Sequence, residues 1–307
     1  NGIARAIVGG NPWGAVSQFG SRASGVYAVL VEPDGRGGER LWVGASGDGL
    51  ALYEDRRWRF FTERDGLPTS WVRMIQRAPD LEGRDTLWLG FSHGELMRIL
   101  PGPRFEPVAT PWEKSESQAV LDVLARTHDG ARELWVATRT AGLYRWRQGA
   151  WTHFRPAGAP EKSGVTSMVE QIDAQGKAWL WASGSQGLLR FDGERITTLE
   201  EGVGRVGHSL SGLSLFRDGG RDVLWVGSTD RGLKRVDVTD PRHPKPDTRP
   251  IPPPPDPYVY GALRDSRGRT YVCTNNGVQR LMVHDEQWIS HVSRRRDGMP
   301  HDECNTN

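Results

Sequence analysis

The stretch Leu41-Trp42-Val43-Gly44-Ala45-Ser46-Gly47-Asp48-Gly49-Leu50-Ala51-Leu52-Tyr53 decides the fold, because shortened forms of it return along the whole chain. Its aromatic anchor recurs at Trp42, Trp88, Trp135, Trp181, Trp225 and Tyr271. The spacings between successive anchors are 46, 47, 46, 44 and 46 residues. A period near 45 means that one supersecondary unit is copied many times.

The copy at residues 25–68 shows what the unit contains. An apolar stretch at 26–31 precedes an Asp-Gly turn at 34–35, and the Leu-Trp-Val-Gly stretch follows. Two further short apolar or aromatic stretches come next, at 50–53 and 58–61. Each stretch has the length of a strand, turn residues separate them, and none has the period of a helix. The sequence therefore predicts an all-β fold, a β-propeller of four-stranded antiparallel blades.

Six complete blades are visible in the sequence, and residues 1–307 are expected to form a single propeller domain. The six repeats cover about 25–68, 69–112, 113–158, 159–202, 203–256 and 257–300. Residues 1–24 resemble the outer strand of an incomplete blade, and residues 301–307 resemble the start of a further one. We therefore expect seven blades in the native ring, with six closed blades as the alternative.

Recurrent glycines are expected to serve packing and turns. Gly44, Gly90 and Gly227 lie two residues after an anchor, where a missing side chain leaves room for the adjacent blade. A second set should need a positive φ where the second strand turns into the third. This set consists of Gly49, Gly94, Gly142, Gly187, Gly232 and Gly277.

Composition excludes several classes of protein. The formal net charge of +2 on 307 residues gives no footprint for nucleic acid. No run of about 20 apolar residues predicts a membrane-spanning helix. The eight histidines are dispersed without metal-ligand spacing, so neither a metal nor another cofactor is expected. Cys273 is most simply a small apolar residue of a strand, and a disulfide with Cys304 is the less favoured alternative.

The repeat resembles the two-component regulator propeller repeat, most clearly at residues 41–68, 224–233 and 297–307. This resemblance implies the extracytoplasmic, periplasmic sensor region of a bacterial transmembrane signalling protein. The propeller itself would be non-catalytic and would bind a small-molecule ligand such as a carbohydrate. The full-length protein could form a homodimer, and this fragment would not itself insert into the membrane.

Propellers of this kind bind ligands at the mouth of the central channel, where the links between blades meet the turns after each second strand. Aromatic rings mixed with arginines, amides and hydroxyls at these positions suit a sugar or a small acid. The candidate ligand-binding residues are Trp71, Arg73, His93, Arg139, His208, Asp230, Tyr258 and Asn275.

Two other functions stay open. A propeller lyase would need a histidine and acidic residues that converge on the channel mouth, and His93 or His208 could supply the histidine. A protein-interaction scaffold could use the proline-rich stretch 249–257, which departs from the repeat between the fifth and sixth blades. A rigid polyproline II connection explains that stretch more simply, and it should leave the outer strand of the fifth blade short or irregular.

Overall fold

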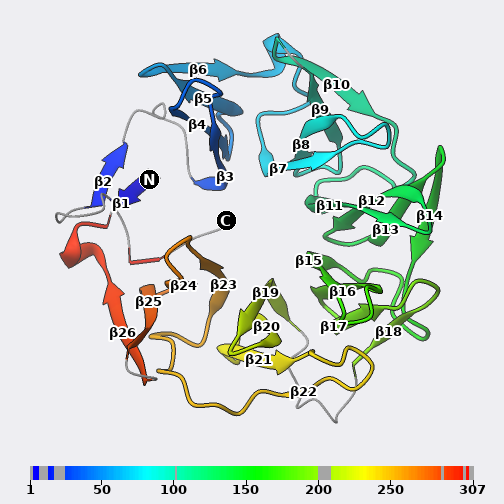
Figure 1. The fold of residues 1–307 in the computed structure, drawn as a ribbon. Helices are drawn as coiled ribbons and strands as arrows, with labels where there is room; N and C mark the ends of the chain where they lie inside the picture. Colours follow the sequence, from blue (N-terminus) through cyan, green and yellow to red (C-terminus); the bar gives the residue numbers. More distant parts are fainter. Residues whose placement is uncertain are drawn as a thin grey trace. The chain divides into compact units, whose positions relative to one another are not determined.

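The structure is a computed structural model that describes residues 25–100, 102–199, 209–284, 287–299 and 302–303, with the backbone of 3–6 and 13–16. The described residues form six four-stranded antiparallel sheets, and each sheet is one blade. Within every blade the strands lie side by side in chain order (Figure 1). The predicted all-β propeller class is confirmed. Among the described residues, no helix has the length and apolar character that crossing a membrane requires.

Contacts divide the chain into two compact units, and blades 1 to 3 belong to the first of them, up to His153. Blade 1 contains β3 (Val26–Pro33), β4 (Glu39–Ala45), β5 (Leu50–Glu54) and β6 (Arg57–Phe61). Blade 2 contains β7 (Val72–Pro79), β8 (Asp85–Phe91), β9 (Leu96–Leu100) and β10 (Arg104–Val108). Blade 3 contains β11 (Val120–His128), β12 (Ala131–Thr138), β13 (Gly142–Arg147) and β14 (Ala150–Phe154).

The second unit begins at Phe154 and holds blades 4 to 6. Blade 4 contains β15 (Val165–Ile172), β16 (Ala178–Gly184), β17 (Gly187–Phe191) and β18 (Ile196–Thr198). Blade 5 contains β19 (Leu210–Asp218), β20 (Arg221–Ser228), β21 (Leu233–Asp237) and β22 (Lys245–Pro246). Blade 6 contains β23 (Val259–Arg264), β24 (Thr270–Thr274), β25 (Gly277–His284) and β26 (Gln287–Ser293).

Each blade falls inside one of the six predicted repeats, while the extent of the domain and the count of seven blades stay predictions. Two one-turn 3-10 helices follow outer strands, η1 (Glu63–Asp65) and η3 (Arg295–Asp297). The sequence indicated one outer strand within residues 1–24. The structure instead has two paired strands there, β1 (Ile3–Ala6) and β2 (Trp13–Val16).

The recurrent tryptophans form the cores of the blades. Trp88, Trp135 and Trp181 are completely buried. A buried indole N–H needs an acceptor, and each of these has one: the carbonyl oxygen of Ala78 at 3.0 Å, and the side chains of Glu133 at 2.9 Å and Gln171 at 2.8 Å. The repeat therefore fixes both the apolar packing of the anchor and the polar contact that makes its burial favourable.

The glycines after the anchors allow neighbouring blades to approach, as predicted. A Cβ atom on Gly44 would lie 2.8 Å from the Cγ1 of Val72, and one on Gly90 would lie 2.7 Å from the carbonyl oxygen of Val120. Val72 and Val120 each open the first strand of the next blade. The predicted turn glycines all have positive φ: Gly49, Gly94, Gly142, Gly187, Gly232 and Gly277.

Cys273 occupies the same register position in blade 6 as Gly44 and Gly90 do in blades 1 and 2, opposite the third residue of the first strand. It is disulfide-bonded, so the expectation of a simple apolar residue is wrong. Cys304, the other cysteine of the chain, lies outside the described residues. Blade 6 thus has a disulfide-bonded residue at the position where blades 1 and 2 have a glycine that lets the next blade come close.

The proline-rich stretch lies against its own unit of the protein. Outer strand β22 has two residues, which agrees with the expected short strand. The amide of buried Gln279 donates hydrogen bonds to the carbonyl oxygens of Pro252 at 3.3 Å and Pro253 at 2.9 Å. Arg235 also donates to the carbonyl oxygen of Arg249. These contacts favour a rigid connection over a segment held ready for a partner.

Candidate functional site

A β-bulge interrupts the first strand of every blade directly after its first residue. Each register shift leaves one residue unpaired: Tyr27, Arg73, Leu121, Thr166, Ser211 and Tyr260. Bulges turn a side chain away from the regular alternation and are common next to functional sites. We call this edge of each sheet, where the first strand begins and the second ends, the bulge edge.

Backbone hydrogen bonds bring the two predicted sets of loop residues together at the bulge edge of each blade. The residue after the second strand donates its N–H to the carbonyl oxygen of the residue just before the first strand. The donor–acceptor pairs are Ser46–Gly25, Ser92–Trp71, Arg139–Ala119, Ser185–Gly164, Thr229–Ser209 and Asn275–Tyr258, at 2.8–3.3 Å. The links between blades and the strand-two turns therefore share one edge of each blade, as the repeat predicted.

In the first unit, Arg73 is the best-defined candidate. Its guanidinium donates from Nε to the Oγ of Ser92 at 3.0 Å and lies 3.7 Å over the ring of Tyr27. Burial lowers the pKa of Arg73, and the nearby positive charge of Arg139 lowers it further. Two guanidinium groups from neighbouring blades thus share this part of the bulge edge. An anionic molecule placed there would offset their mutual repulsion, and hydroxyl groups could accept hydrogen bonds from them.

Trp71 adds an aromatic surface to the same edge. Its backbone is held by the bridge to Ser46 and by the bond from the N–H of Ser92 to its carbonyl oxygen. Its side chain nevertheless remains 41% exposed. An exposed ring on a fixed backbone can stack against a flat ligand with little loss of conformational entropy.

The histidine candidates are less well supported. His93 is half-buried, and its carbonyl oxygen accepts a hydrogen bond from the N–H of Ser115 at 3.1 Å. His208 lies outside the described residues, so its predicted role stays a prediction. Within the described ranges, no three His, Cys, Asp or Glu side chains gather as a group that could hold a metal ion.

The second unit brings two of the candidates together. The Oη of Tyr260 lies 2.6 Å from the Oδ1 of Asn275 and 3.0 Å from a carboxylate oxygen of Glu303, and its ring centroid lies 4.7 Å from that of Tyr258. Burial, and next the hydrogen bond with Glu303, raise the pKa of the Tyr260 hydroxyl. Asp230 is exposed in the turn of blade 5 and accepts a hydrogen bond from the Oγ of Ser228 at 2.6 Å.

The sequence did not predict Tyr27, Thr166 and Ser211 as candidate site residues, although their aromatic or hydroxyl side chains lie at the bulges. A signal was present in the sequence. Apolar residues open each first strand with a spacing of three, as in Val26 and Val29 or Val165 and Met168. Strict alternation requires a spacing of two or four, so a spacing of three indicates one extra residue between them.

Comparison with known proteins identifies the fold. No family model and no curated protein matches the chain. Among solved structures, the extracellular domain of a proposed hybrid two-component system, BT3049 from B. thetaiotaomicron, aligns with a TM-score of 0.63 and 18% identity over 91% of this chain and 35% of that one. A catalytically inactive virginiamycin B lyase from Staphylococcus aureus, with quinupristin, aligns at 0.62 and 12% over 92% and 89%.

A WD40 β-propeller domain, that of Doa1, is similar at a TM-score of 0.56 and 11% identity, over 87% of this chain and 82% of that domain. At these identities the likeness shows the fold alone. The chain spans 35–41% of the length of the two-component extracellular domains it matches. The resemblance of the repeat to two-component regulator propellers predicted structural neighbours of this kind.

Proposed function

We propose that this propeller binds a small ligand at its bulge edge and serves as a sensor module in the extracytoplasmic part of a bacterial transmembrane signalling protein. The observation that carries the proposal is the guanidinium of Arg73, which is held by Ser92 and Tyr27 at the bulge edge. The positive charge of Arg139 in the next blade acts on it, and the ring of Trp71, two positions before Arg73, is 41% exposed. This combination suits a sugar or a small acid.

Two further observations support the extracytoplasmic location. Cys273 is disulfide-bonded, and structural disulfides persist in oxidising compartments such as the periplasm. The fold neighbours include extracellular domains of two-component systems. Signal transmission would require the ligand to bind one arrangement of the whole receptor more tightly than another.

The lyase alternative is supported by the fold of the virginiamycin B lyase. Catalysis of that kind would require acidic side chains near His93 or His208. The one hydrogen bond of His93 within the described residues is on its backbone, where its carbonyl oxygen accepts from the N–H of Ser115. We therefore favour binding without catalysis.

The experiment is a thermal-shift screen of the protein against neutral and acidic oligosaccharides and small dicarboxylic acids. A ligand that binds only the folded state at 100 times its Kd adds about 2.7 kcal/mol to the free energy of unfolding. We expect Arg139→Ala and Trp71→Ala to abolish the shift, because each removes one element of the group.

Trp58→Ala serves as the control, since it removes a half-buried aromatic side chain from an outer strand of blade 1. The proposal is contradicted if no compound shifts the Tm of the folded protein. It is also contradicted if a shift survives unchanged in both bulge-edge variants.

A further inference from the structure

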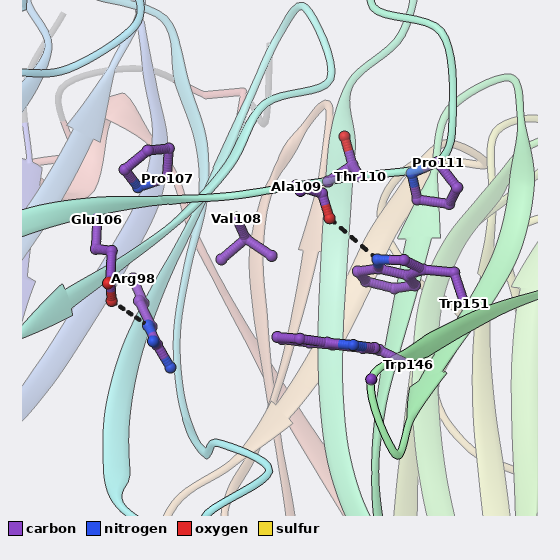
Figure 2. Close-up of a pocket in the computed structure, with 10 residues that line it drawn as sticks. Arg98, Glu106, Pro107, Val108, Ala109, Thr110, Pro111, Trp146 and Trp151 are labelled. Atoms are coloured by element: carbon purple, nitrogen blue, oxygen red, sulfur yellow. Dashed lines mark hydrogen bonds and ion pairs between the residues drawn. The ribbon is translucent and has the colours of Figure 1, made fainter.

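A cleft of about 350 Å³ opens between blades 2 and 3, away from the bulge edge. Its walls come from the outer strand of blade 2, the segment that follows it, and the hairpin between the third and fourth strands of blade 3 (Figure 2). The residues that matter here are Arg98, Glu106, Pro107, Val108, Trp146 and Trp151. The volume lies at the lower end of the range for small-molecule sites, ~300–1,000 Å³.

Two tryptophans of blade 3 form one wall, and they are held in place before any ligand arrives. Trp146 and Trp151 stack with ring centroids 5.4 Å apart and an interplanar angle of 15°. The indole N–H of Trp151 donates to the carbonyl oxygen of Ala109 at 3.0 Å (Figure 2). The rings of Trp112 and Trp151 meet edge to face, with centroids 5.5 Å apart. Because Trp151 is fixed, it holds the half-buried Trp146 as a rigid aromatic surface.

The opposite wall is polar but carries no excess of positive charge. Arg98 donates from Nε to the carboxylate of Glu106 at 2.5 Å (Figure 2). Its Nη1 also lies 3.4 Å from the carboxylate of Asp80. The Glu106 side chain remains 42% exposed, whereas that of Arg98 is 18% exposed. The wall thus presents a carboxylate acceptor next to a guanidinium whose charge is already balanced, and it does not select an anion.

We propose that this cleft is a saccharide-binding site for one or two neutral pyranose rings of an oligosaccharide, separate from the bulge edge. A pyranose has an apolar face of C–H groups, which matches the ring of Trp146 and the side chains of Val108 and Pro107. It also carries neutral hydroxyl groups, which match Glu106 and Arg98. An apolar cleft with a few convergent polar groups is the usual composition of a small-molecule site.

Blade 1 offers an internal comparison. Tyr53 and Trp58 form an aromatic pair at 5.0 Å in the equivalent hairpin, where Tyr53 faces Leu41 as Trp146 faces Leu134. The aromatic pair is therefore a recurring element of the outer hairpin. In blade 3 the pair also borders a cleft whose far wall is the Arg98–Glu106 ion pair of blade 2.

The test is a titration with cellohexaose, xylohexaose and mannohexaose, followed by tryptophan fluorescence and calorimetry. We expect Trp146→Ala to weaken binding at least tenfold, since it removes the stacking surface, and Glu106→Gln to weaken it roughly threefold to tenfold. Glu106→Gln keeps the size of the side chain, so it tests the site even if Trp146→Ala does not fold. Trp58→Ala, in the equivalent hairpin of blade 1, should leave the affinity unchanged.

Two results overturn the inference: none of the three hexasaccharides binds the folded protein, or binding persists in Trp146→Ala and Glu106→Gln. Arg139→Ala separates this site from the bulge edge. Binding lost in Arg139→Ala and kept in Trp146→Ala would contradict the cleft and support the proposed function. Binding lost in Trp146→Ala and kept in Arg139→Ala would support the cleft.

Discussion

Replacing Gly90 with alanine should test whether the glycines after the anchors set the distance between blades. A Cβ atom at this position would lie 2.7 Å from the carbonyl oxygen of Val120 and 2.9 Å from its Cβ and Cγ1. The nearest atom belongs to the backbone of β11, so rotation of a side chain cannot relieve the overlap. Strand β11 would have to move away from β8, and its packing on blade 2 would loosen.

Overpacking of this kind costs about 1–3 kcal/mol of the free energy of unfolding. Because one neighbouring atom is backbone and Trp88 beside it is completely buried, we expect about 2 kcal/mol. For a unit of roughly 150–250 residues, this lowers the Tm by about 4–8 °C. The measurement is thermal and urea unfolding followed by circular dichroism.

Gly261→Ala is the matched control. Gly261 lies in the first strand of blade 6, whereas Gly90 lies in the second strand of blade 2; the φ of Gly261 is not positive, and an added Cβ would meet no atom within 4 Å. We expect this variant to be neutral or more stable by up to about 1 kcal/mol, since alanine restricts the unfolded chain. If Gly90→Ala unfolds at the same temperature as Gly261→Ala, the glycines do not set the spacing between blades.

Two further predictions concern buried polar and covalent contacts. Burial acts to raise the pKa of Glu32, but hydrogen bonds from Trp42, Arg77 and Arg40 outweigh it and hold the pKa below the ordinary 4.5. The contribution of Glu32 to stability is therefore complete above pH 4.5 and is lost as the pH falls through the lowered value. In urea unfolding at pH 7, Glu32→Gln should have a free energy of unfolding about 1.5–3 kcal/mol below that of the original protein. This difference between the two proteins should become smaller in acid, and a difference that does not change with pH would contradict the prediction. Because Cys273 is disulfide-bonded, dithiothreitol should lower the free energy of unfolding by about 2–4 kcal/mol. Cys273→Ser should lose the same stability, and dithiothreitol should then have no further effect on it. If dithiothreitol still destabilises this variant, the disulfide is not the cause of the effect of the reductant.

The repeat made most of the fold predictable, because its apolar positions and turn glycines serve packing that is local to a blade and its neighbour. Trp135 is buried and Gly142 has a positive φ, and both residue types recur at the same positions of the other repeats. Cys273 was misread because its register position in the strand is the same whether its thiol is free or disulfide-bonded. Spacing along the chain does not show whether such a residue meets a side chain or a sulfur atom.

The candidate site was less predictable, because its geometry depends on a bulge that breaks the alternation of the strand. Arg73 could be placed at the bulge edge from its position in the repeat. Its contacts with Tyr27 and Ser92 could not be predicted, because Tyr27 belongs to another blade and Ser92 to the turn after β8. The cleft beside Trp146 was missed entirely, since its two walls are about 40 residues apart in the sequence.

The blade count depends on faces that the described blades leave uncovered. Val29, Ile75 and Val123 occupy the same register position, opposite the residue after the anchor tryptophan. Ile75 and Val123 are 7% and 0% exposed, and Ile75 belongs to a core that it shares with Trp42 of the preceding blade. Val29 is 47% exposed. Full burial of one such side chain stabilises by about 1.5–3 kcal/mol, so the first strand of blade 1 has the surface of a strand that receives a preceding blade.

Blade 6 shows the complementary feature in the second unit. Ser214 and Leu263 both lie opposite the anchor, in blades 5 and 6. Ser214 donates to the carbonyl oxygen of Ala262 in the following blade at 2.6 Å, whereas Leu263 is 68% exposed. Leu30 and Val169 hold the same position in blades 1 and 4 and pack against cores, whereas Leu263 is a large apolar side chain that stays mostly exposed among the described residues. Since a blade cannot bury both faces alone, the exposure of Val29 and Leu263 agrees with the expectation of a seventh blade, which stays a prediction.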